Sequence, residues 1–342
     1  MSSTIKNKNS VKTWGKQVQH DLEPYWSQLN QNIKSSLNSS ISTPESNKIL
    51  THLLNNQGKR IRPLVTLLIP RALNLNISSD HITMATVIEL THTATLLHDD
   101  VIDESLMRRN KQTANSIWGS HAPILAGDFI YSRAIQLMVQ INNQRIMKIL
   151  AAGTNQLIEG ELIQLINTNS FITYNEYIDT IYRKTAIMFE CACECSAIQA
   201  EAEETTIQHC KQFGKQLGII FQIVDDILDY TADNETLGKN TGDDIKQGKF
   251  TLPLINAINT LPKTEQDSII HDIQQKKISF EQINSLIKSS EAIEKCYQEV
   301  RDRQKIATRN DALIFFSIIE PPWVSTFHSP PHFQEARQSS GR

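Results

Sequence analysis

Apolar residues recur along most of this chain at the spacing of α-helices. Between residues 82 and 97 they fall at Ile82, Ala85, Val87, Ile88, Leu90, Ala94, Leu96 and Leu97, which fits a helical period. No alternating apolar run bounded by Asn-Gly or Asp-Gly turns stands out. Pro123 is the single proline between Arg71 and Leu252, so this stretch can hold long helices without a helix breaker. The pattern predicts an all-α fold.

One domain with a tail at each end is expected. The 342 residues suffice for one large domain. Residues 1–12 are polar and are expected to form a disordered tail, so the domain is placed at residues 13–312. Residues 313–342 differ in kind, because helical periodicity stops near Ala312. They hold four of the eleven prolines, at Pro321, Pro322, Pro330 and Pro331.

Composition and charge exclude several classes of protein. The net charge of −3 gives no basic footprint for nucleic acid. There is no run of 18 apolar residues, so no membrane span is expected. The start of the chain lacks the apolar core of a signal peptide, and an odd number of cysteines, five, favours a reducing compartment. A cytoplasmic location is therefore expected. Cys191, Cys193 and Cys195 are interpreted as buried small side chains rather than a zinc site.

An acidic motif of the form DDxxD occurs twice in strongly apolar sequence. Its carboxylates are Asp99, Asp100 and Asp103 in the first copy, and Asp225, Asp226 and Asp229 in the second. On a helix, the first and last carboxylates of each copy share a face. Such crowding is tolerated when a hard cation lies between the carboxylates, and all-oxygen ligands favour Mg²⁺ completed by water and substrate phosphate. A single DDxxD is typical of a solvated helix face, but two copies in apolar settings favour a functional site.

Basic residues that could bind phosphate lie near the first acidic motif. The run Gly58-Lys59-Arg60-Ile61-Arg62-Pro63 has three cations, and Pro63 predicts a helix start with Arg62 outside helical geometry. Helix N-termini and arginine side chains both favour anions. Arg108 and Arg109 follow the first motif closely, so they are placed at the edge of the same presumed cavity. In isolation each group is also typical of an ordinary solvated surface.

Two further features each allow two interpretations. Residues 238–249 alternate glycine, lysine and carboxylates, which is typical of a flexible lid over phosphates and also of a polar loop. His92 lies seven positions before Asp99, on nearly the same face of a helix. It is either a satisfied core histidine or a ligand contact.

Taken together, these motifs resemble the trans-isoprenyl diphosphate synthases, also called polyprenyl synthetases. The resemblance extends from about Ile49 to Ala312 and is strongest to the bacterial members that make octaprenyl diphosphate. It is carried by both DDxxD motifs, Gly58–Pro63, Arg108-Arg109, Thr93–Asp100, Ala126–Tyr131, Lys184–Ala186, Phe221-Gln222 and Gly248–Pro253.

The resemblance implies a single-domain helical bundle around a deep central cavity, usually in a homodimer. It implies Mg²⁺-dependent, head-to-tail condensation of isopentenyl diphosphate onto an allylic diphosphate, with three Mg²⁺ ions in the loaded site. The expected product is octaprenyl diphosphate for quinone side chains, delivered to a membrane.

The resemblance also implies roles for individual residues. Asp99 and Asp103 would bind Mg²⁺ on the allylic diphosphate with support from Asp100, and Asp225 and Asp229, beside Asp226, would serve a further ion. The isopentenyl diphosphate site would comprise Lys59, Arg62, His92 and Arg109. Contacts to the allylic diphosphate would come from Arg108, Lys184, Lys239 and Lys249. Thr185 and Gln222 would lie near the developing carbocation.

Ala94 is the candidate for control of product length. It lies five residues before Asp99, about 7.5 Å along a helix axis. Its small side chain would leave the product tunnel open at that depth, as in long-chain members of the family. The alternative is that Ala94 only packs against a neighbouring helix.

Two other functions compete with the synthase. A class I terpene cyclase also uses an Asp-rich helix and Mg²⁺, but it has no need for Lys59 and Arg62, and its second metal motif is usually not a DDxxD. A non-catalytic partner subunit of a heteromeric prenyl synthase typically lacks one acidic motif, whereas both are intact here. The atypical residues 313–342 leave this second alternative open.

Overall fold

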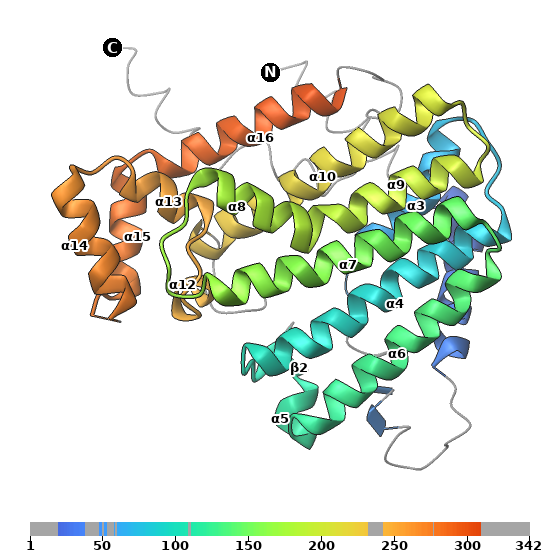
Figure 1. The fold of residues 1–342 in the computed structure, drawn as a ribbon, viewed down its shortest axis with the longest axis horizontal. Coiled ribbons are helices and arrows are strands. Elements are labelled where there is room, and N and C mark those ends of the chain that lie inside the picture. Colours follow the sequence, from blue (N-terminus) through green and yellow to red (C-terminus); the bar gives the residue numbers. More distant parts are fainter. Residues whose placement is uncertain are drawn as a thin grey trace.

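A computed structural model describes residues 20–37, 48–49, 51–52, 58, 60–108, 111–231, 242–275 and 277–308. These residues are almost entirely helical, which confirms the predicted all-α class (Figure 1). One helix covers residues 20–36. The labelled elements that follow are α3 (Ile61–Ala72), α4 (Ser79–Ile102), β1 (Met107–Arg108), β2 (Lys111–Gln112), α5 (Ala114–Trp118), α6 (His121–Gln140), α7 (Gln144–Ile166), α8 (Tyr174–Ile181), the π-helix η1 (Tyr182–Ala186), α9 (Ile187–Gln199), α10 (Glu204–Thr231), α12 (Asp243–Lys246), α13 (Leu252–Ile258), α14 (Lys263–Gln274), α15 (Phe280–Ser289) and α16 (Ala292–Thr308).

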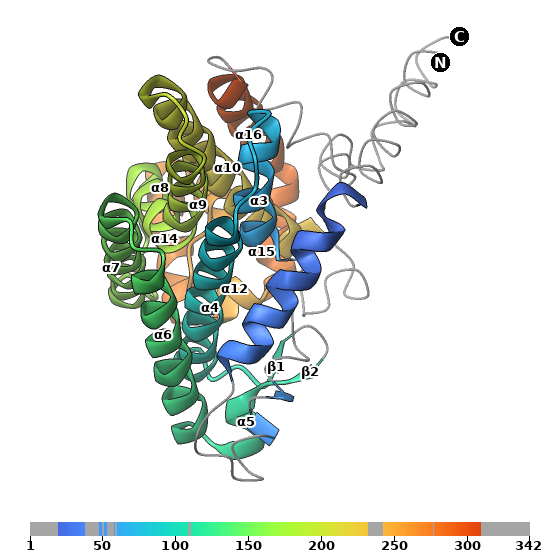
Figure 2. The ribbon, with the colours of Figure 1, turned by 90° about the vertical axis from the view of Figure 1, so that its right-hand side faces the viewer.

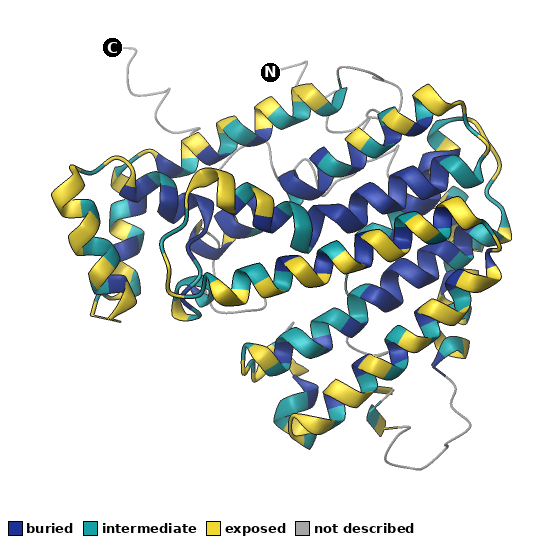
Figure 3. Cartoon of the chain, viewed as in Figure 1, coloured by how far each residue is buried: buried dark blue, intermediate teal, exposed yellow. Residues whose placement is uncertain are grey.

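Helix α9 lies at the centre of the bundle. It packs against α3, α4, α7 and α10, and every residue from Ile187 to Ala197 is buried (Figure 3). Most of its side chains are small or apolar, as expected for a central helix, and the buried Glu190 and Glu194 pair with Lys211 of α10. Cys191, Cys193 and Cys195 are buried there as free thiols, as the sequence predicts.

Helices α4 and α10 carry the two acidic motifs, and the segments around the motifs lie in different hydrophobic clusters. Helix α4 packs chiefly on α6, α3 and α9, whereas α10 packs on α9 and α16. The first hydrophobic cluster joins the helix over residues 20–36 to α3, α4, α6, α7, α9 and the N-terminal half of α10. Figure 2 shows the helix over residues 20–36 beside α4. The second joins the C-terminal half of α10 to α13, α15 and α16. The first motif therefore lies beside one cluster and the second motif beside the other.

The start of α3 corrects one prediction. The helix begins at Ile61, so Arg62 lies in its first turn rather than outside helical geometry. Arg60 reverses the chain before it, with a left-handed φ of 50°. Pro63 is tolerated because backbone N–H groups in a first turn have no intrahelical acceptor.

A small hairpin follows α4 and was not predicted. Strands β1 and β2 pair antiparallel, with Met107 opposite Gln112 and Arg108 opposite Lys111. They form the one sheet within the described residues. Strands of two residues are too short to show alternation in a sequence, so the signal was absent.

The predicted tails lie outside the described residues. Helix α16 ends at Thr308, before residue 313, and residues 1–12 precede the first described segment. The domain bounds of 13–312 therefore stay a prediction. Among the described helices, none is long and apolar enough to cross a membrane.

Candidate active site

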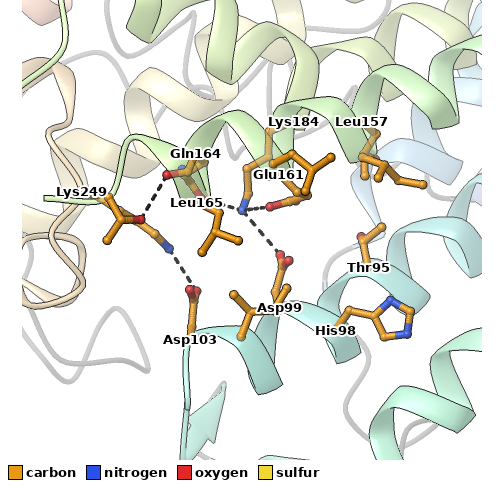
Figure 4. Close-up of a pocket in the computed structure, with 14 residues that line it drawn as sticks. Thr95, His98, Asp99, Asp103, Leu157, Glu161, Gln164, Leu165, Lys184 and Lys249 are labelled. Atoms are coloured by element: carbon orange, nitrogen blue, oxygen red, sulfur yellow. Dashed lines mark hydrogen bonds and ion pairs between the residues drawn. The ribbon is translucent and has the colours of Figure 1, made fainter. Parts of the chain in front are cut away.

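A cavity of about 190 Å³ opens between the C-terminal half of α4 and the facing side of α7 (Figure 4). Both outer carboxylates of the first acidic motif, Asp99 and Asp103, line it. The other lining residues are Thr95, His98, Ile102, Leu157, Ile158, Glu161, Leu162, Gln164, Leu165, Thr168, Lys184 and Lys249. The cavity thus joins a charged end to an apolar wall.

Lys184 connects α7 to the first acidic motif. Its ammonium group donates a hydrogen bond to Glu161 and one of 2.8 Å to Oε1 of Gln164. It also lies 3.6 Å from Oδ2 of Asp99. Burial opposes the charged form of Lys184, but the carboxylates of Asp99 and Glu161 outweigh it and raise the pKa of Lys184. A permanent cation therefore faces Asp99 across the cavity.

Glu161 is the second carboxylate beside this lysine. Burial raises the pKa of Glu161 to about 7, and the charge of Asp99 adds to the rise while Lys184 opposes it. Three carboxylates, those of Asp99, Asp103 and Glu161, line the cavity together with two lysines. The site has an excess of carboxylate oxygen for additional cations to neutralise.

A π-helix positions Lys184 and Thr185. Such insertions are rare and often occur at functional sites. Gly160 of α7 allows the close approach, because a Cβ atom there would lie 2.6 Å from the backbone nitrogen of Lys184. On the other side, a Cβ atom on Gly218 would lie 2.4 Å from the Cα atom of Ala186. The backbones of α7 and α10 therefore pack directly against the π-helix, at Gly160 and Gly218.

Lys249 approaches the same motif from the segment after α12. Its ammonium group donates to Oδ2 of Asp103 at 3.0 Å and to Oε1 of Gln247 at 2.6 Å. The preceding Gly248 has a φ of +75°, and a Cβ atom there would lie 2.2 Å from Oδ1 of Asn169. Only glycine suits both constraints, so Gly248 fixes the course of the chain that presents Lys249.

The middle carboxylate of the first motif turns away from the cavity. Asp100 is buried and accepts a hydrogen bond of 2.8 Å from Nε of Arg108. Burial raises the pKa of Asp100, and Arg108 opposes that rise. Asp100 therefore holds the predicted phosphate contact Arg108 in place.

The second motif is more deeply enclosed than the first. Asp225 is half-buried, whereas Asp226 and Asp229 are buried. Oδ2 of Asp229 accepts a hydrogen bond of 3.3 Å from the backbone N–H of Asp244. Burial and the charge of Asp244 raise the pKa of Asp226. None of the three carboxylates lines the cavity beside Asp99.

The donor set at the cavity suits a hard cation that shares its ligands with a substrate. Asp99 and Asp103 offer carboxylate oxygens, the ligands that Mg²⁺ prefers. Within the described ranges there is no cluster of three or more His, Cys, Asp or Glu side chains able to hold an ion alone. Mg²⁺ commonly completes its shell with water and phosphate, so the residues fit Mg²⁺ bound together with a diphosphate.

Part of the predicted basic site is also assembled. NH1 of Arg62 lies 3.1 Å from Nε2 of His92, and its guanidinium stacks 4.7 Å from the ring centre of Phe189. This stacking is a favourable cation–π geometry. The other predicted basic residues, Lys59, Arg109 and Lys239, lie outside the described residues.

Comparison with known proteins decides the family. The polyprenyl synthetase family model matches residues 43–290. The chain is 45% identical over 243 residues to the octaprenyl diphosphate synthase of Haemophilus influenzae, covering 71% of this chain and 73% of that protein. It is 44% identical to the octaprenyl diphosphate synthase of Escherichia coli, covering 68% and 71% of the two chains. This chain belongs to the polyprenyl synthetase family.

Solved structures agree with the fold of this polyprenyl synthetase. The decaprenyl diphosphate synthase of Rhodobacter capsulatus matches with a TM-score of 0.83 and 31% identity, covering 92% of this chain and 100% of that one. A polyprenyl synthase of Caulobacter crescentus, solved with calcium and isoprenyl diphosphate, matches with a TM-score of 0.81 and 32% identity. That match covers 89% of this chain and 97% of the other.

In this polyprenyl synthetase, Ala94 is 2% exposed and is not among the residues that line the cavity. Its helical neighbours Thr95 and His98 line it instead. The role of Ala94 in product length stays a prediction.

Three residues of the polyprenyl synthetase site were missed from the sequence. Glu161 and Gln164 both contact Lys184, and Tyr177 contacts Asp226. The available signal was two polar residues three apart on the otherwise apolar end of α7, which places them on one face of a helix. A buried tyrosine hydroxyl leaves no comparable pattern.

Proposed function

We propose that this chain is a long-chain trans-polyprenyl diphosphate synthase. It condenses isopentenyl diphosphate head-to-tail onto an allylic diphosphate and makes octaprenyl diphosphate for quinone side chains. The observation that carries this proposal is the cavity in which Asp99 and Asp103 meet Lys184 and Lys249 beside an apolar wall. The identity to octaprenyl diphosphate synthases supports the chain length.

Asp99 and Asp103 would hold Mg²⁺, with Asp225 and Asp229 serving a further ion and three ions in the loaded site. Bound Mg²⁺ supplies the positive charge that stabilises a departing diphosphate. Lys184 and Lys249 already point into the cavity, and Arg108 pairs with Asp100 of the first acidic motif. We assign these cations, with Lys239, to the allylic diphosphate.

The apolar wall of the cavity would protect a reactive intermediate from water. Loss of diphosphate leaves an allylic carbocation, which water would quench. Leu157, Ile158 and Leu162 line the cavity on the α7 side, and this apolar wall would exclude water once substrate fills the cavity. Thr185 and Gln222 join η1 to α10 through a hydrogen bond of 2.8 Å, and we place them beside the developing cation.

We assign isopentenyl diphosphate to the group around Arg62 and His92, with Lys59 and Arg109 as further contacts. Arg62 is held by its stacking on Phe189 and its contact with His92. A guanidinium held in this way loses little further freedom when it binds phosphate. A terpene cyclase would have no use for this second basic group.

We propose that the enzyme acts as a homodimer through α6. This helix leaves several large apolar side chains in solvent, among them Leu125, 68% exposed, and Val139, 54% exposed. Exposed apolar patches of this kind mark protein interfaces. Sedimentation equilibrium should give twice the chain mass, and Leu125→Lys with Val139→Lys should give the monomer.

A cytoplasmic enzyme that passes its product to a membrane is consistent with the cysteines. All five are free and buried, as expected in a reducing compartment. The proposed location is tested by fractionating cells and measuring where the activity resides.

Incubation of the purified chain with radiolabelled isopentenyl diphosphate, an allylic diphosphate and Mg²⁺ tests the proposed activity. Chromatography of the dephosphorylated product should give octaprenol. Release of a hydrocarbon would identify a terpene cyclase. Turnover that appears only after a second subunit is added would identify a non-catalytic partner subunit.

A further inference from the structure

Hydrogen bonds connect a buried tyrosine of α8 to the π-helix through the second acidic motif. The hydroxyl of Tyr177 donates to Oδ2 of Asp226 at 2.6 Å. Nε2 of Gln222 donates to Oδ1 of Asp226 at 2.8 Å, and the hydroxyl of Thr185 donates to Oε1 of Gln222 at 2.8 Å. We call these four residues the Tyr177 relay.

The relay determines which way the amide of Gln222 points. A primary amide has a donor end and an acceptor end. Because Asp226 accepts from the donor end, the carbonyl oxygen of Gln222 faces Thr185. The single hydroxyl proton of Thr185 is then committed to Gln222, and the remaining lone pair of Thr185 is left for other contacts.

Tyr177 holds the carboxylate of Asp226, which accepts the hydrogen bond from Gln222, in place. It is 2% exposed, and burial together with the charge of Asp226 raises the pKa of Tyr177, so its hydroxyl remains a donor. Without it, Oδ2 of Asp226 would lose a buried hydrogen bond. The carboxyl group could then rotate, and the acceptor that fixes the orientation of the Gln222 amide would move.

We propose that Tyr177 is a positioning residue that orients Gln222 and Thr185 with their negative dipole ends toward the allylic cation. This inference rests on the proposed function. Tyr177 itself touches no substrate and acts through Asp226. Oriented dipoles stabilise charge as it develops, so their loss affects the chemical step more than substrate binding.

Tyr177→Phe tests the relay, because it removes the hydroxyl and keeps the ring. The turnover number should fall about tenfold or more, while KM for both substrates stays within roughly twofold. Tyr230→Phe is the matched control. Tyr230 is also 2% exposed, and its hydroxyl accepts a weak bond of 3.3 Å from Thr251. Tyr230→Phe should keep the wild-type turnover number, although its melting temperature should change about as much as that of Tyr177→Phe.

A double-mutant cycle with Thr185→Val separates positioning from structural support. If Tyr177 acts through Thr185, the double variant should be no slower than the slower single variant, since losses within one network are not additive. Multiplicative losses would overturn the proposal, as would a Tyr177→Phe turnover number equal to that of Tyr230→Phe.

Asp226→Asn keeps the proposal testable if Tyr177→Phe does not fold. An asparagine can present a donor to Gln222, so the turnover number should fall at least as far, and a wild-type value would overturn the relay. Failure of the proposed function is a different result. In that case the wild-type chain itself would not elongate an allylic diphosphate.

Discussion

The ammonium group of Lys249 lies 3.0 Å from Oδ2 of Asp103, although the two residues are 146 positions apart in the chain. Lys184 makes a similar approach to Asp99, at 3.6 Å. In this state, protein cations lie beside the carboxylates that we assign to Mg²⁺. In the proposed reaction, binding of a metal diphosphate would exchange these ion pairs for lysine–phosphate contacts.

Lys249→Met should raise KM for the allylic diphosphate on the order of tenfold, because a charge-assisted contact to phosphate is lost. Steady-state kinetics with saturating isopentenyl diphosphate measures this. Lys246→Met is the control, since Lys246 lies on the same segment but is exposed and pairs with Asp243. Equal KM values in the two variants would contradict the assignment.

Asp99→Asn and Asp225→Asn should each reduce turnover by roughly 100-fold or more, because each removes charge from a proposed Mg²⁺ site. Asp179→Asn, at an exposed ion pair with Arg183, should keep full turnover. The melting temperature of metal-free Asp99→Asn should change little. Relief of like-charge repulsion is offset there by loss of the contact with Lys184. Near-normal activity under saturating Mg²⁺ would exclude the metal assignment for that residue.

The metal-free enzyme should lose stability as the pH rises toward neutral. The folded pKa of Glu161 is raised to about 7 from an ordinary 4.5, so the folded state binds this proton more tightly than the unfolded state. The stabilising contribution is fully present below pH 4.5 and is lost as the pH passes 7. Melting temperatures in chelator from pH 5 to 8 should show this fall. Glu161→Gln should flatten it, and an unchanged slope would show that another group is responsible.

Ala94→Phe should shift the product from octaprenyl diphosphate to shorter prenyl diphosphates while isopentenyl diphosphate is still consumed. A bulky ring at this depth would close the product tunnel. Chromatography of dephosphorylated products measures the shift. Thr95→Phe is the informative comparison, since Thr95 lines the described cavity and Ala94 does not. If Thr95→Phe shortens the product and Ala94→Phe does not, then Thr95 rather than Ala94 controls product length.

The family and the all-α class could be predicted because their signals are local in the sequence. The acidic motifs each occupy little more than one helical turn, and their apolar flanks distinguish them from solvated faces. Lys184 and Lys249 were placed near Asp99 and Asp103 through the resemblance alone, since pairs so distant in the chain have no local signal.

Other features depended on contacts that the sequence does not display. Glu161 is one of two carboxylates on α7, and its importance comes from the lysine that η1 brings to it. The start of α3 was misplaced because Arg60 reverses the chain in a left-handed conformation, which is uncommon for a residue other than glycine. The hairpin after α4 was missed because two-residue strands carry no period.

The π-helix between α8 and α9 separates the sequence constraints on the two helices. A π-turn contains one residue more than an α-turn, which rotates everything after it by about 100° around the helix axis. As a result, the residues that α8 turns toward its neighbours do not lie on the same face of the helix axis as the residues that α9 buries. Substitutions that repack the centre of the bundle along α9 need not alter which residues of η1 face the cavity. Deletion of one residue within Tyr182–Ala186 would make α8 and α9 one continuous α-helix. The residues that α9 must bury and the residues that η1 places at the cavity could then not both keep their positions.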